Sequence, residues 1–309
     1  MKKCICFAIL TASMCIVPVR TFAWSGAGHM VIAAEAYHEL PERTRSKVDE
    51  ILKAHPDYAK WVATHSKEKF ADLSLSEYVF LRASKWPDEI RRAKGQGSRS
   101  YDHPHWHYVD YPLKPTKFPL EPGPSPKDDL LYGIAQCEKN LCDSKASPEE
   151  KAVYLSYLIH LVGDVHQPLH CCSLVNETYP NGDKGGNDFY VKPGNKGIKL
   201  HSFWDGLLGT SSKPQTQIYY AIELLHDHPR KSLPELAKAT TPKDWSLEGR
   251  QIAIDKAYLR ADINGGCGTS EQNACELPSN YTKEAKAVAE NRAALAGYRL
   301  ADEIQMLIK

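Results

Sequence analysis

The sequence predicts a mainly α-helical protein of one domain, in which long loops form the functional site. Three observations support this prediction. Apolar residues recur at helical spacing over most of the chain, prolines and helix-capping residues bound these segments, and the alternation typical of strands is scarce. Because no repeat, low-complexity linker or shift in composition divides the 309 residues, we expect a single unit.

Each helical segment is justified by its own residues. Pro41 ends the first segment, and Pro87 is expected to break the third. Ser147 followed by Pro148 is typical of a helix start, because Ser caps free N–H groups and Pro fits the first turn. The final segment is rich in Ala, which favours helix strongly. Helices are expected over residues 32–40, 42–53, 78–86, from 148 to a break at Gln167-Pro168, 218–225, 247–263 and 282–307.

Strand signal is confined to residues 189–191, which are expected to form one strand of a hairpin. Two loop-rich stretches interrupt the helices: residues 94–126 hold many prolines, and residues 179–199 are rich in Gly and Asn. Loops of this length within a compact domain are usually functional. Both lie beside clusters of histidine, so we expect them to form the site.

The first 23 residues are expected to be a secretory signal peptide. Two lysines precede an apolar stretch over 4–19, and Thr21-Phe22-Ala23 supplies small residues at the cleavage positions. The alternative is an uncleaved membrane anchor, but the apolar stretch is shorter than the ~20 residues that span a bilayer. The mature protein, residues 24–309, would be a single secreted or periplasmic domain, monomeric and without membrane association.

The charge balance excludes a strong electrostatic attraction to nucleic acid. The chain is 42% hydrophobic and 25% charged, with a formal charge of +1. Loss of Lys2, Lys3 and Arg20 with the signal peptide leaves 36 basic residues against 38 acidic ones. A polyanion would therefore have to be held by a local site, because the global charge does not attract it.

Six cysteines remain after cleavage, and an oxidising compartment favours disulfides among them. Proximity in sequence favours the pairs Cys137–Cys142 and Cys267–Cys275. A metal site built from thiolates is the alternative, but the sequence contains no C-x-x-C pair.

Candidate metal ligands begin on the long helix that starts at Pro148. His160 and Asp164 are four residues apart, so their side chains leave the same helix face one turn apart. Gln167-Pro168 ends the helix, and His170 then approaches from a new direction. His201 and Asp205 repeat the spacing of four. The alternative for each pair is a His–Asp contact that stabilises a helix slightly and binds no metal.

Two further clusters join these pairs. Asp88 follows Trp86-Pro87, directly after the expected helix break. His103, His105 and His107 alternate around Trp106, where the alternative is a surface loop without metal, and we expect one ligand among the three. Histidine and aspartate ligands without cysteine suit zinc, while manganese and iron are chemically permitted.

Cleavage after Ala23 would leave Trp24 with a free α-amine. A neutral amine and the carbonyl oxygen of the same residue can chelate a cation in a five-membered ring, and His29 lies five residues further on. An amide nitrogen in an uncleaved chain has no lone pair to give, so metal binding would depend on export. The alternative is that Trp24 only packs its indole and His29 caps a helix.

Together these motifs resemble the zinc-dependent S1/P1 nuclease family. The family pattern is a mature N-terminal Trp with His five residues later, followed in order by W-x-D, H-[FY]-x-D, H-x-x-G-D-x-x-Q-P-L-H, G-G-N and H-x-x-W-D. Every part is present between Trp24 and Asp205. The resemblance implies a mainly α fold of the phospholipase C/P1 nuclease type.

The resemblance also implies three clustered zinc ions. Asp164 is expected to bridge two of them, while His103, His105 and His166 match no ligand position. By motif, the first ion takes Asp88, His107, His160 and Asp164, the second takes the Trp24 amine and carbonyl, His29 and Asp164, and the third takes His170, His201 and Asp205.

Substrate contacts are implied in the same way. Asp88 would orient the attacking water and Arg91 would bind phosphate. Tyr108 would stack on an unpaired base, Asp110 would hydrogen-bond base edges, and Asn187 would belong to the substrate site. The implied reaction is hydrolysis of single-stranded DNA or RNA to 5′-phosphate products, with 3′-nucleotides as further substrates.

Two other functions share parts of this pattern. A zinc-dependent phospholipase C also begins with a metal-binding Trp, but its last helical pair tends to be His and Glu, whereas this chain has Asp205. An exported zinc-binding protein without enzymatic activity would keep every ligand and lose the open coordination positions.

Overall fold

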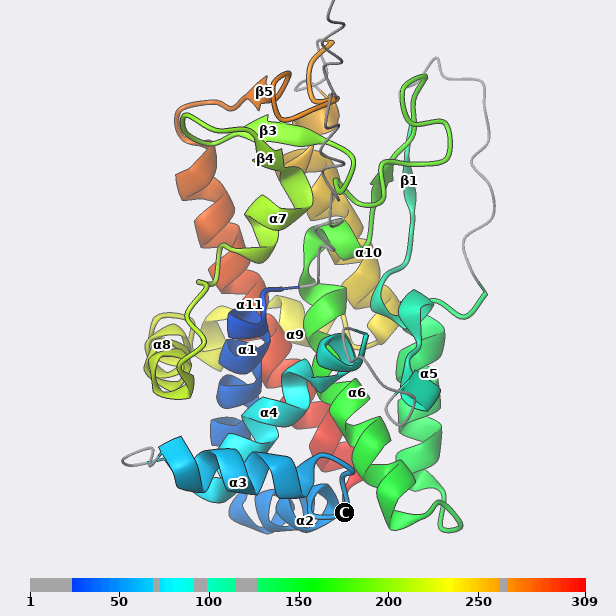
Figure 1. The fold of residues 1–309 in the computed structure, drawn as a ribbon, viewed down its shortest axis with the longest axis vertical. Helices are drawn as coiled ribbons and strands as arrows, with labels where there is room; N and C mark the ends of the chain where they lie inside the picture. The colour runs from blue at the N-terminus through cyan, green and yellow to red at the C-terminus, as the bar shows by residue number, and fades with distance from the viewer. Residues whose placement is uncertain (1–23, 69–72, 92–98, 115–126, 262–265) are drawn as a thin grey trace, which may run out of the picture.

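Helices dominate the part of the chain that the computed structural model describes, which comprises residues 24–68, 73–91, 99–114, 127–261 and 266–309 (Figure 1). The predicted fold class is therefore confirmed. The α-helices are α1 (Gly26–Glu39), α2 (Glu42–Leu52), α3 (Tyr58–Glu68), α4 (Leu75–Ile90), α5 (Leu130–Cys142), α6 (Pro148–His166), α7 (Leu200–Asp205), α8 (Pro214–Asp227), α9 (Glu235–Lys238), α10 (Pro242–Ile252) and α11 (Tyr281–Leu307).

Short elements connect these helices. The strands form two small sheets. In one sheet β1 runs parallel to β2, and in the other the strand order is β4-β3-β5. The strands are β1 (Pro112–Leu113), β2 (Ser173–Leu174), β3 (Tyr190–Lys192), β4 (Ile198–Lys199) and β5 (Cys275–Glu276). The single-turn segments are η1 (Arg99–Tyr101), η2 (Pro104–His107), η3 (Pro168–His170), η4 (Arg230–Ser232), η5 (Ala253–Ala257) and η6 (Leu259–Ala261).

Two helices form the centre of the molecule. α6 packs against α4, α5 and α11, while α1 packs against α4, α8 and α11. All residues of α1 over 27–37 and of α6 over 155–166 are buried. Helices that are enclosed on every side bury their polar side chains together with their apolar ones. Any His or Asp in these two stretches is therefore inside the protein.

The long helix α6 begins as its capping residues predict. The Ser147 side chain accepts a hydrogen bond from the backbone N–H of Glu150, and the Glu150 carboxylate accepts one from the N–H of Ser147 at 2.8 Å. This reciprocal capping box satisfies two donors that the helix start leaves free. The helix ends at His166, one residue before Gln167, where a break was expected.

Several of the expected helix boundaries are wrong: α1 begins six residues before residue 32, α8 begins four residues before residue 218, and α3 and α5 lie where no helix is expected. Two further differences have a clear physical reason. Pro87 lies inside α4, which continues to Ile90, because Trp86 and Pro87 are both buried and their packing outweighs one missing hydrogen bond. Asp88 therefore lies on the helix. The segment expected over 247–263 begins earlier as α10 and changes at residue 253 to the single π-helical turn of η5. Its expected end lies outside the described residues.

One predicted disulfide is present and the other is wrong. Cys267 and Cys275 form a disulfide that links the segment before β5 to β5 itself. Cys137 and Cys142 are free thiols. Both lie on α5, five residues apart. At about 100° per residue, their side chains point about 140° away from each other around the helix axis. Cys137 is consequently buried while Cys142 is exposed, and the two cannot meet.

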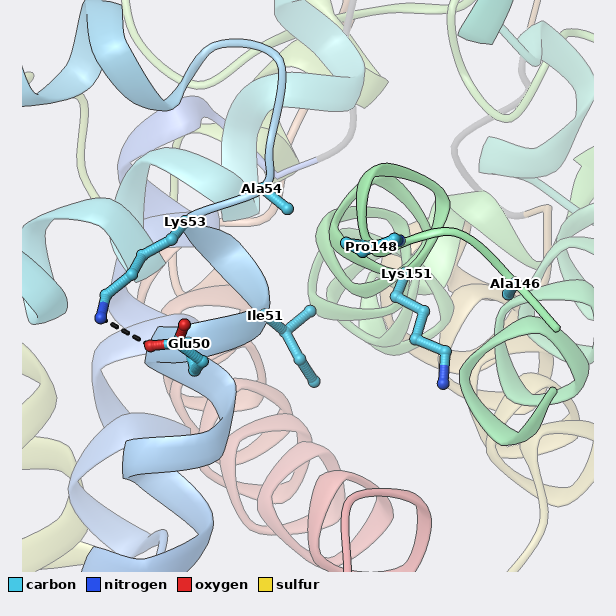
Figure 2. A pocket seen from close by; sticks show the side chains of 7 residues that line it. All are labelled: Glu50, Ile51, Lys53, Ala54, Ala146, Pro148 and Lys151. Carbon is cyan, nitrogen blue, oxygen red and sulfur yellow. Dashed lines mark hydrogen bonds and ion pairs between the residues drawn. The ribbon is translucent and has the colours of Figure 1, made fainter. Parts of the chain in front are cut away.

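A shallow pocket of about 580 Å³ lies between the end of α2 and the start of α6 (Figure 2). Figure 2 shows Ile51 and Pro148 at its walls, with the Lys53–Glu50 ion pair at one rim. Twelve residues of α6 separate Pro148 from His160, which is roughly 18 Å of helix. The pocket therefore lies away from the candidate metal ligands.

Within the described ranges, none of the helices combines the length and apolarity that a membrane crossing requires.

Removal of the buried His55 imidazole should make the protein less sensitive to acid. The ring stacks on Trp61 at 4.3 Å and meets Trp86 edge-on at 4.6 Å, and burial lowers its pKa from 6.5 to about 3. Because the folded-state pKa lies below the unfolded one, this contribution to stability is complete above about pH 6.5. It is lost as the pH falls toward 3, at about 1.4 kcal/mol per pH unit.

Urea unfolding at pH 7 and pH 5 measures this effect. Between these pH values, His55→Phe should lose about 2 kcal/mol less stability than the wild type. His226→Phe is the control, because the His226 side chain is 87% exposed and should follow the wild type. Equal pH dependence of the His55 variant and the wild type would contradict the assignment.

Candidate metal centre

The predicted histidine and aspartate ligands meet where α1, α4, α6 and α7 approach the turns η2 and η3. Each of the eight residues is at most 7% exposed. Within the described residues they form three adjoining groups that could hold metal ions. They are His29 on α1, Asp88 on α4, His107 at the end of η2, His160 and Asp164 on α6, His170 in η3, and His201 and Asp205 on α7.

His107, His160 and Asp164 present donor atoms at the spacing expected around one cation, with Asp88 beside them. His107 Nδ1 lies 3.0 Å from both His160 Nε2 and Asp164 Oδ2, and the last two atoms are 3.2 Å apart. Asp88 Oδ1 lies 3.8 Å from each of the two imidazole nitrogens. Ligands placed tetrahedrally at 2.0–2.1 Å from zinc are about 3.3 Å from one another. The donor atoms of His107, His160 and Asp164 therefore have the spacing of zinc ligands, and Asp88 Oδ1 lies slightly farther from the two imidazoles.

Backbone carbonyls fix which nitrogen three of the histidines present. His160 Nδ1 lies 2.7 Å from Ser84 O, His201 Nδ1 lies 2.6 Å from Gly185 O, and His170 Nδ1 is bonded to the His107 carbonyl. A carbonyl oxygen only accepts, so each Nδ1 carries the proton. Each Nε2 then keeps a lone pair for the centre, as metal-binding histidines require.

Asp164 faces two groups at once. Its Oδ2 points to His107 and His160, while its Oδ1 lies 3.3 Å from His29 Nε2. The ring of His29 stacks on that of His160 with centroids 3.9 Å apart. One carboxylate can therefore serve two neighbouring cations, which is the bridging role that the sequence motif implies.

The third group lies on the other side of the α6 end. The His170 and His201 rings are 4.9 Å apart, and His201 Nε2 lies 3.6 Å from Asp205 Oδ2. Gln167 donates to the second oxygen of Asp205 at 2.8 Å and accepts from the Leu169 N–H at 2.6 Å. Gln167 thus orients Asp205 from the turn that also carries His170.

The start of the described chain is anchored between these groups. The indole of Trp24 is fully buried and donates to Gly163 O at 3.0 Å, and the N–H of Ser25 donates to Asp205 O at 3.0 Å. Gly163 also leaves room for the ring of His29, because a Cβ at residue 163 would lie 2.9 Å from His29 Nδ1. The backbone of Trp24 therefore lies between α6 and α7, beside the ligands.

Burial sets the protonation of these groups. It lowers the pKa of His29 to about 4 and holds those of His107 and His170 well below the usual value. It raises the pKa of Asp164 to about 6 and that of Asp205 well above its usual range. Neutral imidazoles have lone pairs ready at neutral pH, and buried carboxylates need a cation to offset the loss of water.

Hydrogen bonding also points to cations. Within the described part of the chain, Nε2 of His170 is buried without a hydrogen-bond partner. A buried orphan nitrogen costs free energy unless a metal or a ligand occupies its lone pair. The donor set and its unfilled bonding capacity therefore both fit divalent metal ions.

The substrate residues expected from the motifs lie outside the three groups. Arg91 caps the end of α4 with its side chain 27% exposed, 3.9 Å from Asp102 Oδ1. Tyr108 and Asp110 are half-buried after His107, and burial raises the pKa of Asp110 to about 6. Asn187 is half-buried, and its side chain donates to Lys184 O at 2.9 Å.

The other three histidines are held elsewhere. His103 stacks on Trp106 with centroids 3.8 Å apart, and His105 lies 3.2 Å from both carboxylate oxygens of Asp128. His166 is fully buried, with Nδ1 2.7 Å from Val162 O and Nε2 2.8 Å from an Arg299 nitrogen. None of the three belongs to a group that could hold a metal in the described residues.

Sequence reasoning missed the residues that orient the ligands. Ser84 and Gly185 act through their carbonyls, which any residue type supplies, so composition gives no signal for them. Gly163 does give one, since a glycine inside a buried helix next to a ligand indicates close approach of another side chain.

Fold and site together define a class: a mainly α protein whose buried His and Asp side chains form adjoining groups able to hold metal ions. The chain belongs to the S1/P1 nuclease family, whose profile, described as S1/P1 Nuclease, matches residues 24–309. The protein is therefore a hydrolase that acts on nucleic acids.

Named relatives agree with this assignment. The chain is 26% identical to Endonuclease 4 of Arabidopsis thaliana, with 90% of this chain and 87% of the relative covered. It is 30% identical to Endonuclease 5 of Arabidopsis thaliana over 70% of this chain and 73% of that protein. It is 24% identical to Nuclease S1 of Aspergillus oryzae over 93% of this chain and 92% of the relative.

Substitution of Gly163 by Ala should weaken metal binding at least tenfold. The added methyl group would lie 2.9 Å from His29 Nδ1 and push that ring away from Asp164. Gly194→Ala is the matched control, because a Cβ at residue 194 meets nothing within 4 Å. Competition with a chromophoric chelator measures the zinc affinity of both variants. Wild-type affinity in the Gly163 variant would contradict this close contact.

Proposed function

We propose that the protein is exported, loses residues 1–23, and acts as a monomeric three-zinc nuclease in the periplasm or outside the cell. It hydrolyses phosphodiester bonds of single-stranded DNA and RNA to leave 5′-phosphates, and also acts on 3′-nucleotides. The observation that carries the proposal is the Asp164 carboxylate, whose two oxygens face separate sets of imidazole nitrogens.

The proposed ligand sets follow the three groups. Asp88, His107, His160 and Asp164 hold the first zinc, and His170, His201 and Asp205 hold the third. His29, Asp164 and the Trp24 amine and carbonyl hold the second. An imidazole nitrogen has one lone pair, so His160 serves the first ion only, although it also lies near His29. When bound, zinc activates water as a nucleophile and offsets charge that develops on a phosphoryl group.

The protein supplies the remaining parts of the reaction. Asp88 has a second carboxylate oxygen that can accept a proton from the attacking water and orient it. Arg91 lies within electrostatic reach of the centre: the pKa of His107 is lowered mainly by burial and further by this guanidinium. A partly exposed guanidinium at that place suits the binding of phosphate oxygens.

Preference for single strands follows from Tyr108 and Asp110. Tyr108 adjoins the His107 ligand and is half-buried, so one part of its ring is held while the other can meet a base. Stacking on an aromatic ring contributes ~1–3 kcal/mol per base and needs a base that is not already stacked in a duplex. Asp110 accepts hydrogen bonds from base edges, and Asn187 adds a polar contact.

Export is supported by three observations. The family match begins at Trp24, the first residue after the proposed cleavage position. The Cys267–Cys275 disulfide suits an oxidising compartment. The backbone around Trp24 lies beside the third group through the bond from Ser25 to Asp205. A free amine at Trp24 would therefore lie next to a residue that is bonded to the ligand-bearing helix α7.

Three substrates separate this proposal from its alternatives. The mature protein is incubated with single-stranded DNA, a 3′-mononucleotide and phosphatidylcholine, with and without a chelator. We expect 5′-phosphate products from the DNA, phosphate from the mononucleotide and loss of both activities with the chelator. Release of choline phosphate in their place would assign a phospholipase C. Binding of three zinc ions without any turnover would assign a zinc-binding protein.

Extension of the mature protein by one residue tests the terminal chelate. A Met placed before Trp24 converts the amine to an amide, so zinc content should fall from three ions toward two and activity should fall with it. The control carries an added residue after Lys309, far from the ligands in sequence, and should keep three zinc ions. Full zinc content in the N-terminally extended form would exclude the amine as a ligand.

A further inference from the structure

The end of α6 is capped entirely by groups from outside the helix. The last four carbonyls of a helix have no partner within it, and each needs a donor when buried. In α6 the Gly163 carbonyl accepts from the Trp24 indole at 3.0 Å and that of Asp164 from the Gln167 N–H at 3.0 Å. The Val165 carbonyl accepts from the Cys171 thiol at 3.4 Å, and the His166 carbonyl accepts from Arg292 at 3.3 Å.

Arg292 belongs to a buried ionic cluster. Arg292 and Arg299 both lie on α11 and are 1% and 3% exposed. Glu248 of α10 joins them, with its Oε2 2.8 Å from a nitrogen of each guanidinium and its Oε1 3.1 Å from Arg299. Arg299 also reaches Nε2 of His166 at 2.8 Å. We call these four residues, His166, Glu248, Arg292 and Arg299, the α6 clamp.

Charge and shape both favour this arrangement. Two guanidinium groups and one carboxylate leave one positive charge at the end of α6, where the helix dipole is negative. Arg292 bonds in three directions: Nε to His166 O, one terminal nitrogen to Glu248 and the other to Trp245 O at 3.4 Å. Only a planar fork of donors can make these contacts together, so a lysine would lose some of them.

His166 is held entirely within the α6 clamp. His166 is two residues after Asp164, yet both of its ring nitrogens are engaged, one by Val162 O and the other by Arg299. Burial, aided by the two arginines, keeps its pKa well below the usual value, so the ring is neutral. Two residues along a helix turn a side chain by about 200°, so His166 faces Trp245 and Arg299 on the side of α6 away from Asp164.

We propose that Arg292, supported by Arg299 and Glu248, is a positioning residue for the metal centre. Asp164 lies in the last turn of α6 and His170 in the turn that follows, so the place where the helix stops sets the distance between them. With the His166 carbonyl held by α11, the chain leaves the helix at Gln167, and Gln167 in turn orients Asp205. This inference rests on the zinc sites of the proposed function.

Arg292→Lys tests the proposal, because it keeps the charge and removes the fork. We expect zinc affinity, measured by chelator competition, to fall ten- to a hundredfold, as is usual when a residue that orients ligands is lost. The melting temperature of the zinc-free protein is recorded for the same samples. Arg230→Lys is the matched control. Arg230 of η4 makes a bidentate ion pair with Asp302 of α11 at an exposed position, so this variant should keep wild-type affinity.

A second control separates positioning from general destabilisation. Leu295→Ala also lies on α11, in a small cluster with Leu233 and Tyr298 apart from the main core, and should lower the melting temperature without a change in zinc affinity. Should Arg292→Lys fail to fold, Glu248→Gln applies the same test, because it keeps the side-chain volume and removes the shared charge.

The outcomes separate this inference from the proposed function. Wild-type zinc affinity in the clamp variant, or a loss no larger than that of Leu295→Ala at equal melting temperature, would overturn the positioning role. Fewer than three zinc ions in the wild type would instead count against the proposed function. A selective loss of affinity in Arg292→Lys supports the α6 clamp.

Discussion

The Asp164 carboxylate is the group on which the rest of the structure depends. It is fully buried at the centre of the protein, and its two oxygens face imidazoles from three different elements, α1, α6 and η2. A carboxylate in such a place is costly unless cations compensate it. The elements around it bring three imidazole nitrogens, from His29, His107 and His160, within 3.3 Å of its oxygens.

This constraint explains why the ligands are carried mainly by buried helices. α1 and α6 are enclosed along most of their length, so the ligands they carry have no alternative partners in water. The same enclosure requires Gly163, where His29 leaves no room for a side chain. Rigid helices hold the ligands more precisely than loops would, and the turns η2 and η3 add the ligands that must approach from other directions.

Much of the fold and the centre could be predicted from the sequence, because the decisive features are local. The His160–Asp164 spacing, the Ser147 cap and the stop at Pro168 follow from helix geometry and do not depend on how the helix packs in the fold. Pro87 and the Cys137–Cys142 pair were misjudged because tertiary packing and helix phase decide them. The carbonyls of Ser84 and Gly185 could not be anticipated, since their role depends only on which backbone atoms the fold brings near each imidazole.

The position of α11 has a consequence for attempts to miniaturise the enzyme. Every candidate metal-ligating residue precedes residue 206, so a shortened chain could keep the full ligand inventory. α11, however, packs against both α1 and α6, the two helices that carry His29, His160 and Asp164. Deletion of this helix would open one wall of the core to water, so the ligand-bearing half alone is a poor starting point for a compact nuclease.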